Sequence, residues 1–263
     1  MEKKDILKDY LASRLITQHK IVDGYGKVYY KVNEDLIDTC LDVDFYQKDV
    51  LAVLSSGDHV LTSRFLEAKN VDAFDSNKLT IYYFYLRLWT IKYRDSLYPN
   101  VFEGNTWLAR LLRKVNPQNN NELCALLFFK KHLEGNTRLD NLFYQIDAQP
   151  QGKTLYSTAD ELQDCLSPKL DFYHVDLFSP LKAKKTYDVI LISNILDWAK
   201  NDPSRLENVK DNLARLLNDE GTVICSSLVR NDERSFAQER EIFDSDFEFD
   251  GNMQGYTYTR KKH

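Results

Sequence analysis

The chain has 263 residues, with 35 basic and 40 acidic side chains and a formal charge of −5. This length can bury a full core without metals or disulfides, and it fits one large domain or one domain with an insertion. The composition excludes collagen-like, low-complexity and wholly disordered proteins. The mild acidity argues against a protein that coats nucleic acid by bulk charge, so nucleic acid is not the expected partner.

The sequence shows no signal for export or for membrane insertion. Its N-terminal residues lack the apolar core of a secretory signal. The longest apolar run, from Leu123 to Phe129, is far shorter than the roughly 20 residues that span a bilayer. The cysteines are far apart and have no zinc-site spacing: Cys40, Cys124, Cys165 and Cys225. We expect a cytoplasmic protein with reduced cysteines, no transmembrane segment and no metal site.

Five short runs rich in Val, Ile and Leu end in polar residues, a pattern typical of parallel strands covered on both faces. They span residues 49–54, 71–74, 171–175, 187–192 and 222–228. Apolar residues from Leu79 to Tyr93 recur at helical spacing. A capping box at Ser204–Glu207, just after Pro203, opens another helix. The alternation of strands and helices predicts an α/β fold with a doubly wound sheet.

The end of the chain breaks this alternation. Residues 241–249 and 255–260 predict two strands joined by a turn at 250–252, which gives the sheet an antiparallel C-terminal hairpin.

A long stretch before the third strand also departs from it. Three helical patterns, at 106–115, 121–133 and 138–146, and a polar loop at 147–154 precede that strand. We therefore expect one domain over residues 1–263, with an N-terminal helical segment at 1–48 and a helical insertion at 95–164.

The loop after the first strand is the first place to look for a ligand, because open α/β sheets bind ligands at the carboxyl ends of their strands. Its sequence, Ser55-Ser56-Gly57-Asp58, contains one glycine, which permits backbone approach to a ligand. It lacks the glycines of a dinucleotide-binding turn and of a P-loop. Asp75 ends the second strand, where a carboxylate can accept both hydroxyl hydrogens of a ribose. This pattern favours a nucleoside without a diphosphate, with S-adenosylmethionine (SAM) as the candidate.

Several motifs together resemble a known family. They are Glu34-Asp35, the segment from Val53 to Leu61, the segment Val71–Asn77, Leu86 with Ile91-Lys92, and the segment Tyr187–Trp198. These motifs resemble the betaine-lipid-type 3-amino-3-carboxypropyltransferases, which are SAM-dependent enzymes. The resemblance covers roughly residues 34–93 and 187–258. It implies a Rossmann-like methyltransferase fold, with a mostly parallel seven-stranded sheet, and SAM as the co-substrate.

The resemblance also implies roles for particular residues. Around the donor, Ser56, Gly57 and Asp58 would line the methionine moiety, with Ser55 also among the donor-binding residues. Asp75 would hold the ribose, with Asn77 close by, and Asp176 and Leu177 would border the adenine. Around the reaction, Ser193 and Asn194 would face the sulfonium, and Asp197 and Trp198 would border the acceptor pocket. Tyr25, in the segment Asp23–Gly26, belongs either to a simple turn or to a lid over the donor.

The expected chemistry needs little from the protein beyond alignment. A sulfonium is an activated leaving group, so proximity supplies much of the rate enhancement and a strong base is optional. We expect transfer of the 3-amino-3-carboxypropyl group to a hydroxyl or amine of a small molecule or lipid headgroup. Two alternatives stay open: a SAM-dependent small-molecule methyltransferase, and a non-catalytic binding protein that keeps the fold.

Simpler interpretations stand beside some of these assignments. Asp75 could cap the helix that begins near Asn77. His59, near a helix start, is more typical of a capping or surface residue, and His174, inside a strand, of a core histidine. The aromatic run Tyr82–Tyr85 is more typical of packing than of a ligand cage.

Overall fold

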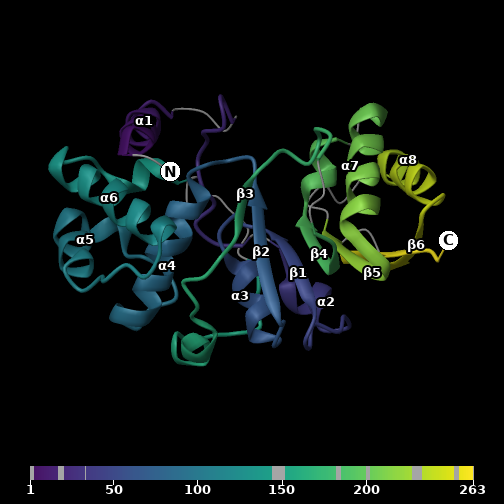
Figure 1. Cartoon of the computed structure of the whole chain (residues 1–263), viewed down its shortest axis with the longest axis horizontal. Coiled ribbons are helices and arrows are strands. Elements are labelled where there is room, and N and C mark those ends of the chain that lie inside the picture. Colours follow the sequence, from purple (N-terminus) through teal and green to yellow (C-terminus); the bar gives the residue numbers. More distant parts are fainter. Residues whose placement is uncertain are drawn as a thin grey trace.

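The computed structural model describes residues 3–16, 21–32, 34–143, 152–181, 185–199, 202–226, 233–251 and 255–262. These residues form a seven-stranded sheet with the strand order β3-β2-β1-β4-β5-β7-β6 (Figure 1). The strands are β1 (Asp49–Val53), β2 (Asn70–Asp75), β3 (Phe172–His174), β4 (Tyr187–Ser193), β5 (Leu217–Ser226), β6 (Phe247–Gly251) and β7 (Gly255–Arg260). The first five pair in parallel, and β7 joins β5 and β6 antiparallel. The predicted fold class is confirmed.

Helices cover both faces of the sheet. They are α1 (Lys3–Arg14), α2 (Leu36–Cys40), α3 (Asp58–Phe65), α4 (Thr80–Arg94), α5 (Asn105–Leu112), α6 (Asn120–Glu134), α7 (Pro203–Leu216) and α8 (Glu233–Phe243). Short 3-10 helices span Val101–Glu103, Leu139–Leu142, Asp160–Cys165 and Ile195–Trp198. In Figure 1, α4, α5 and α6 lie at one end of the molecule, and α7, α8 and the hairpin lie at the other.

The strands divide the interior into two cores, because successive side chains of a strand point to opposite faces. In β1, Val50 and Ala52 belong to the core under α2, α3 and α4, whereas Leu51 and Val53 belong to the core under α7 and α8. The sheet is therefore covered on both sides, as the near-continuous apolar strands predict.

Helix α4 is buried all round over Thr80–Ile91. It lies between the sheet and the helices α5 and α6, which cover its outer side (Figure 1). The ring of Tyr82 stacks on Phe128 of α6, with 4.3 Å between the centroids. The aromatic run of α4 is thus a packing element, as expected for a helix that is apolar on every side.

Two elements, the first strand of the hairpin and the helix at 138–146, were predicted with the wrong boundaries. Residues 241–243 belong to α8, so the first strand of the hairpin begins only at Phe247. The buried Phe243 ends that helix and stacks on Tyr258 of β7, with 4.6 Å between the ring centroids. The predicted helix at 138–146 is a 3-10 helix over Leu139–Leu142, and residues 144–151 lie outside the described residues, as do 227–228 after β5.

Helix α7 is capped by a different residue from the one predicted. The side chain of Asp202 accepts a hydrogen bond from the Arg205 N–H, and Pro203 occupies the first turn. Ser204 donates its hydroxyl proton to Asp202 at 2.7 Å. Asp202 is therefore the N-cap, which fits the preference for proline at the first helical position.

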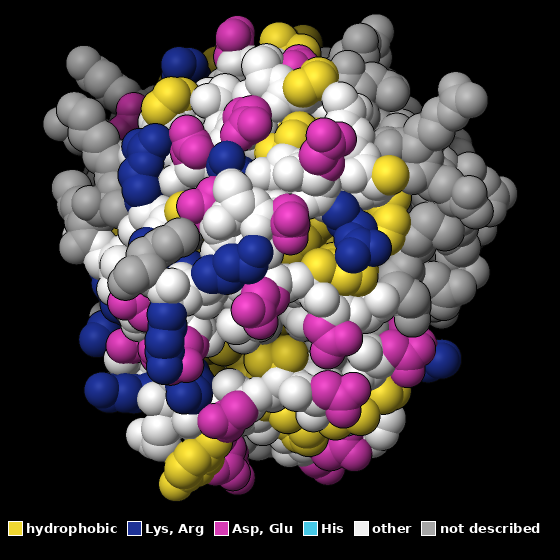
Figure 2. All heavy atoms as spheres, turned by 90° about the vertical axis from the view of Figure 1, so that its right-hand side faces the viewer, with side chains coloured by type: hydrophobic (Ala, Val, Ile, Leu, Met, Phe, Trp, Pro, Cys, Tyr) yellow, Lys and Arg dark blue, Asp and Glu magenta, His cyan; other side chains and the backbone are white. Residues whose placement is uncertain are grey.

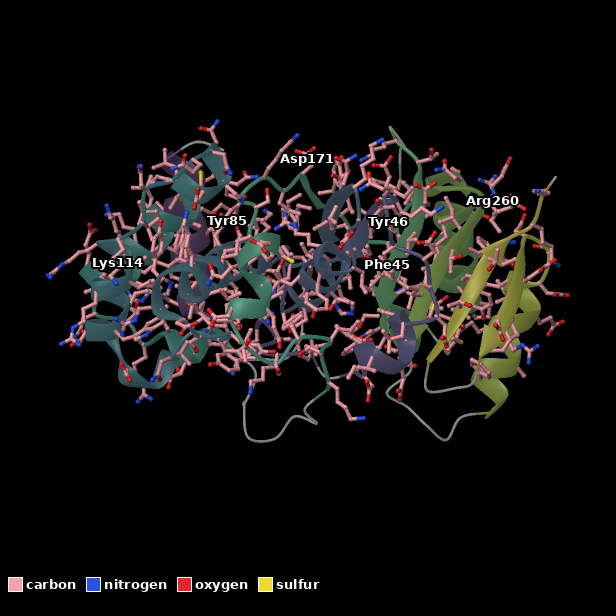
Figure 3. All side chains as sticks on the ribbon, turned by 90° about the horizontal axis from the view of Figure 1, so that it is seen from below. Phe45, Tyr46, Tyr85, Lys114, Asp171 and Arg260 are labelled. Carbon is pink, nitrogen blue, oxygen red and sulfur yellow. The ribbon has the colours of Figure 1, made fainter. Side chains whose placement is uncertain are left out.

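The surface carries both signs of charge. Figure 2 shows the end of the molecule with α7, α8 and the hairpin, where acidic and basic side chains are interspersed. Lys114, just after α5, and Arg260 of β7 lie at opposite ends in Figure 3. Within the described ranges, no helix is both long and apolar enough to cross a membrane.

Candidate functional site

A cleft of about 790 Å³ lies at the carboxyl edge of the sheet. β1 lies between β2 and β4, so the chain crosses from one side of β1 to the other at this edge, which is where doubly wound sheets bind ligands. Eight of the predicted site residues line the cleft: Ser55, Asp75, Asn77, Asp176, Leu177, Ser193, Asn194 and Trp198. The residues Ser56, Gly57, Asp58, Asp197 and Tyr25 are not among its lining residues.

The loop after β1 turns sharply, and its glycine serves the turn. Gly57 has a φ of +89° and precedes the first turn of α3. A Cβ atom at Gly57 would lie 2.9 Å from Cδ2 of Phe84 in α4. The loop therefore needs glycine both for its backbone conformation and for the close approach of α4. Of the four loop residues, Ser55 is the one that reaches the cleft.

Asp58 is fully buried and saturated with hydrogen bonds. Five groups donate to its carboxylate: Arg87 Nη2 (2.6 Å), Tyr156 Oη (2.6 Å), Tyr98 Oη (3.3 Å), Ser56 Oγ (2.6 Å) and the Val32 N–H (2.9 Å). Burial raises the pKa of Asp58, but the charge of Arg87 and these hydrogen bonds outweigh it, so the pKa lies below its usual value. Arg87 also donates to the Ser56 carbonyl at 2.9 Å. This cluster fixes the loop from behind the cleft.

Asp75 lies at the end of β2 and faces the cleft while 8% exposed. One carboxylate oxygen accepts the Ser55 N–H at 2.9 Å and the other accepts the Asn77 N–H at 2.8 Å. The Thr80 side chain also donates to this carboxylate, which has about four acceptor positions in all, so it can still accept from a ligand. Burial raises the pKa of Asp75 to about 6. Helix α4 begins only at Thr80, so Asp75 is not its cap.

Asn77 ties the N-terminal segment to the edge of the cleft. Its Nδ2 donates to the carbonyls of Gly26 and Lys27, at 3.0 and 3.1 Å, and its Oδ1 accepts the N–H groups of Gly26 and Leu79, at 3.2 and 3.1 Å. The side-chain amide is fully used in these bonds. Asn77 therefore anchors the segment that lines one side of the cleft.

Ser193, at the end of β4, connects the cleft to a buried ion pair. Its hydroxyl donates to Oε1 of Glu34 at 2.5 Å, and His59 Nε2 lies 2.9 Å from the same oxygen. Ser226 of β5 donates to the other oxygen, Oε2. The prediction that His59 is a capping or surface residue is wrong, because its side chain is 2% exposed and paired.

In this pair, the charge of each side chain favours the charged form of the other. Burial raises the pKa of Glu34, but the charge of the adjacent His59 and the hydrogen bonds from both serines lower it below its usual value. Burial lowers the pKa of His59, but Glu34, with Asp58 and Asp75, raises it above its usual value. Both shifts favour the charged forms, an ionised Glu34 beside a protonated His59.

Of the other predicted residues, some line the cleft and some lie outside its lining. Asp176 and Leu177, after β3, line the cleft, and Trp198 lies at its rim with 61% of its surface exposed. The N–H of Asp197 donates to the Asn194 carbonyl at 3.1 Å. The hydroxyl of the buried Tyr25 donates to Asp9 of α1 at 2.5 Å, so this side chain fastens α1 to the segment 21–29.

Several cleft residues had no signal in the sequence. His174 was expected in the core, but it is exposed, lines the cleft and lies 2.9 Å from the Ser76 carbonyl through Nε2. Lys27 and Tyr29 come from the segment before β1, and Arg205, from α7, lies over the ring of Phe178 with 4.5 Å to the centroid. These residues reach the cleft through the tertiary fold and belong to no local motif.

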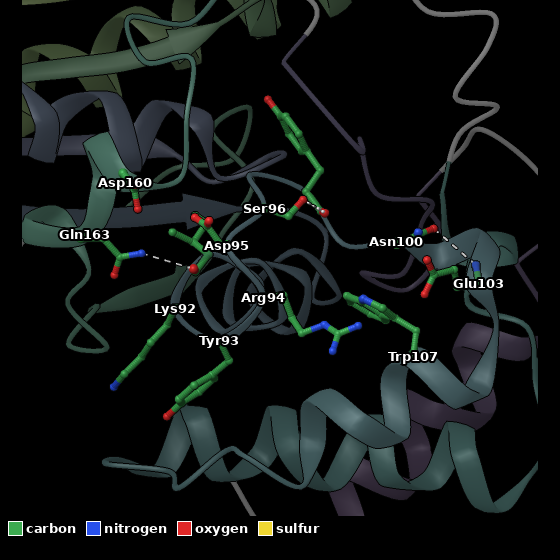
Figure 4. A pocket seen from close by; sticks show the side chains of 12 residues that line it. Lys92, Tyr93, Arg94, Asp95, Ser96, Asn100, Glu103, Trp107, Asp160 and Gln163 are labelled. Atoms are coloured by element: carbon green, nitrogen blue, oxygen red, sulfur yellow. Dashed lines mark hydrogen bonds between the residues drawn. The ribbon is translucent and has the colours of Figure 1, made fainter.

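A second hollow, of about 670 Å³, lies at the end of α4 (Figure 4). Its lining mixes both charges: Lys92, Arg94, Asp95, Glu103 and Asp160. Several of its polar groups are held by local bonds, such as the Glu103 N–H on Asn100 and Gln163 on the Ile91 carbonyl. Its position away from the carboxyl edge of the sheet makes the first cleft the candidate site.

No protein-family model matches the chain, and no curated protein sequence matches it. Solved structures with a similar arrangement include the N-methyltransferase NodS from Bradyrhizobium japonicum with S-adenosyl-L-homocysteine, at a TM-score of 0.39 and 10% identity, over 99% of this chain and 85% of that one. A TehB-like SAM-dependent methyltransferase from Corynebacterium glutamicum gives 0.40 and 9%, over 83% and 82%. A SAM-dependent methyltransferase from Methanosarcina mazei gives 0.40 and 11%, over 82% and 92%. Similarities this low assign neither ligand nor activity to this chain.

Proposed function

We propose that the chain is a SAM-dependent transferase that moves the 3-amino-3-carboxypropyl group to a hydroxyl or amine of a small molecule or lipid headgroup. The observation that carries the donor is the cleft at the carboxyl edge, with the Asp75 carboxylate at the end of β2 among its lining residues. The motifs around Asp75 and Ser193 resemble those of the 3-amino-3-carboxypropyltransferases, and this resemblance supports 3-amino-3-carboxypropyl as the group that is transferred.

The cleft has polar lining residues for the ribose of such a donor and apolar lining residues for its adenine. Asp75 would accept the ribose hydroxyls, while Phe74, Val175, Leu177 and Phe178 offer an apolar side for the adenine. Ser193 and Asn194 would lie near the sulfonium, and Trp198 at the rim would border the acceptor. The bound donor supplies an activated carbon, and these residues align it with the acceptor.

The first experiment is calorimetry with SAM. We expect Asp75→Ala to weaken binding by about 1–3 kcal/mol, as for the loss of hydrogen bonds to a charged group. The matched control is Asp171→Ala, because Asp171 is exposed and outside the cleft lining. Since the pKa of Asp75 is about 6, affinity is expected to fall below pH 6, where the carboxylate becomes protonated. Unchanged affinity in Asp75→Ala would remove the ribose assignment.

Product analysis then identifies the group transferred. Methylthioadenosine as the nucleoside product indicates aminocarboxypropyl transfer, and S-adenosylhomocysteine indicates methyl transfer. No binding of SAM at millimolar concentration by a folded sample would favour a non-catalytic binding protein.

A further inference from the structure

Ser193 is the point at which the buried Glu34–His59 pair reaches the cleft. Ser193 lines the cleft, whereas Glu34 and His59 do not, and their side chains are 5% and 2% exposed. The Ser193 hydroxyl donates to Glu34 Oε1 over 2.5 Å. A proton that leaves a cleft ligand can therefore reach Glu34 through one intervening hydroxyl group.

The backbone of Ser193 is held in an unusual conformation. Its φ of +56° lies in the left-handed region, which favours glycine and costs energy for other residues. Such strain is concentrated at functional sites, where the surrounding structure enforces it. Here the strained residue ends a central strand and places its hydroxyl between the cleft and a carboxylate.

The pair has an open end as well. Within the described part of the chain, neither ring nitrogen of the buried His59 has a hydrogen bond of good geometry: Nδ1 has no partner, and Nε2 contacts Glu34 Oε1 as an ion pair at 2.9 Å. The charged or titratable groups that act on the pair are Asp58, Asp75, Tyr29, Cys40 and Cys225. Unlike the Asp58 cluster, this one is not saturated.

We propose that Ser193 and Glu34, with Glu34 paired to His59, form a proton relay that takes the proton of the acceptor during transfer. The proposal rests on the proposed function. Ser193 is its catalytic residue, while Glu34 and His59 act through Ser193 and are positioning residues. A carboxylate of low basicity is adequate for a hydroxyl acceptor, because an alkylated hydroxyl is a strong acid.

The step balances as follows. The acceptor hydroxyl oxygen forms a bond to the donor carbon, and the bond from that carbon to sulfur breaks with its electron pair going to sulfur. The acceptor proton passes to Ser193 Oγ as the Ser193 hydroxyl proton passes to Glu34 Oε1. The positive charge lost by the sulfonium reappears on the relay, where a neutral Glu34 lies beside a protonated His59.

The chain contains an internal control for this relay. The Ser193 hydroxyl donates to Oε1 of Glu34 and the Ser226 hydroxyl donates to Oε2. Ser193 lines the cleft, but Ser226 is not among its lining residues. Ser193→Ala and Ser226→Ala each remove one hydroxyl hydrogen bond from the Glu34 carboxylate, and Ser193→Ala also removes a 3.2 Å contact to Asn194 Oδ1. A purely structural network predicts similar effects for both, and a relay predicts a large difference.

The test measures SAM binding by calorimetry and single-turnover release of nucleoside product, with water alone and with ethanolamine as the acceptor. We expect Ser193→Ala and Glu34→Gln to slow release by about 100-fold, in the range of general acid–base catalysis, with SAM affinity changed by less than about threefold. Ser226→Ala should slow it by no more than about threefold, because the relay to the cleft stays intact. Ser193→Gly removes the hydroxyl where φ favours glycine, so it should fold and be as slow as Ser193→Ala.

Two results would overturn the relay while the proposed function stands. One is an equal loss of rate in Ser193→Ala and Ser226→Ala. The other is a Ser193→Ala variant that releases product within about threefold of the wild-type rate. Wild-type protein that binds no SAM would instead overturn the proposed function, and with it the reaction that the relay serves.

Discussion

Two neighbouring residues in the first turn of α3, Asp58 and His59, form buried ion pairs of opposite character. Asp58 lies 2.6 Å from Arg87 and accepts five hydrogen bonds, none of which involves a residue of the cleft lining. His59 pairs with Glu34 at 2.9 Å, keeps Nδ1 unpartnered among the described residues, and reaches the cleft through Ser193. A closed polar cluster supports structure, whereas an open one leaves a group free for chemistry.

The two pairs also join different parts of the molecule. Asp58 connects the loop after β1 to α4 and, through Tyr98 and Tyr156, to the stretch between α4 and β3. His59 and Glu34 connect the same turn to the ends of β4 and β5. The first turn of α3 therefore fixes the loop after β1 through Asp58 and contacts the Glu34–Ser193 network through His59.

The largest expected effect is on the closed pair. Asp58→Asn leaves the fully buried Arg87 without its counter-ion, and a guanidinium cannot lose its proton in a protein. We expect the free energy of unfolding to fall by about 3–5 kcal/mol. Urea denaturation measures this, with the exposed Asp171→Asn as control. A loss below about 1 kcal/mol would show that the cluster is not a structural support.

The corresponding change in the open pair should cost less. Glu34→Gln leaves His59 without a counter-ion, but histidine can release its proton and become neutral. We expect a loss of about 1–3 kcal/mol in the free energy of unfolding, mostly from weaker hydrogen bonds. The same denaturation experiment applies. If this variant lost as much stability as Asp58→Asn, the distinction between the two pairs would fail.

The pH dependence of stability sharpens the comparison further. The folded-state pKa of His59 is raised above 6.5, so its pairing energy is fully present below pH 6.5 and is lost as pH rises through the folded-state value. Burial lowers the pKa of Arg87, but the charge of Asp58 outweighs burial and holds it well above its usual value, so the closed pair does not titrate there. Unfolding of wild type and Glu34→Gln over a pH series should therefore converge at alkaline pH. A difference independent of pH would mean that His59 is neutral in the folded protein.

The smallest expected effect concerns one hydroxyl of the closed cluster. Tyr98 donates to Asp58 over 3.3 Å, and four shorter hydrogen bonds to that carboxylate remain without it. Tyr98→Phe should lower the free energy of unfolding by less than about 1 kcal/mol. Tyr156→Phe is the matched comparison, because its hydroxyl donates over 2.6 Å and should matter more. The reverse order would contradict the saturation of Asp58.

Much of the fold, and part of the site, could be predicted from local patterns. Apolar runs with polar ends gave the strands, and a carboxylate at the end of a strand placed Asp75 at the edge of the sheet. Ser193 and Asn194 lie in the cleft for the same reason. The hairpin was mislocated because 241–243 suit a strand locally, while tertiary packing of Phe243 makes them the end of α8.

The roles of Asp58 and His59 could not be predicted, because their partners are remote in sequence. Arg87 is 29 residues from Asp58, Tyr156 is 98 residues away, and Ser193 is 159 residues from Glu34. Nothing local distinguishes a loop carboxylate that faces a ligand from one that is saturated by a buried arginine.

The sequence by itself determined the class of sheet, the edge where a ligand would lie and the scarcity of glycine in the loop after β1, because these follow from local composition and spacing. Only the tertiary structure decided which polar side chains of that loop are available. In the folded chain, donors from three distant segments saturate the Asp58 carboxylate. Glu34, paired with His59, contacts the cleft residue Ser193. The physical reason is that hydrogen-bond saturation depends on all groups within about 3 Å in space, however far apart they are in the chain.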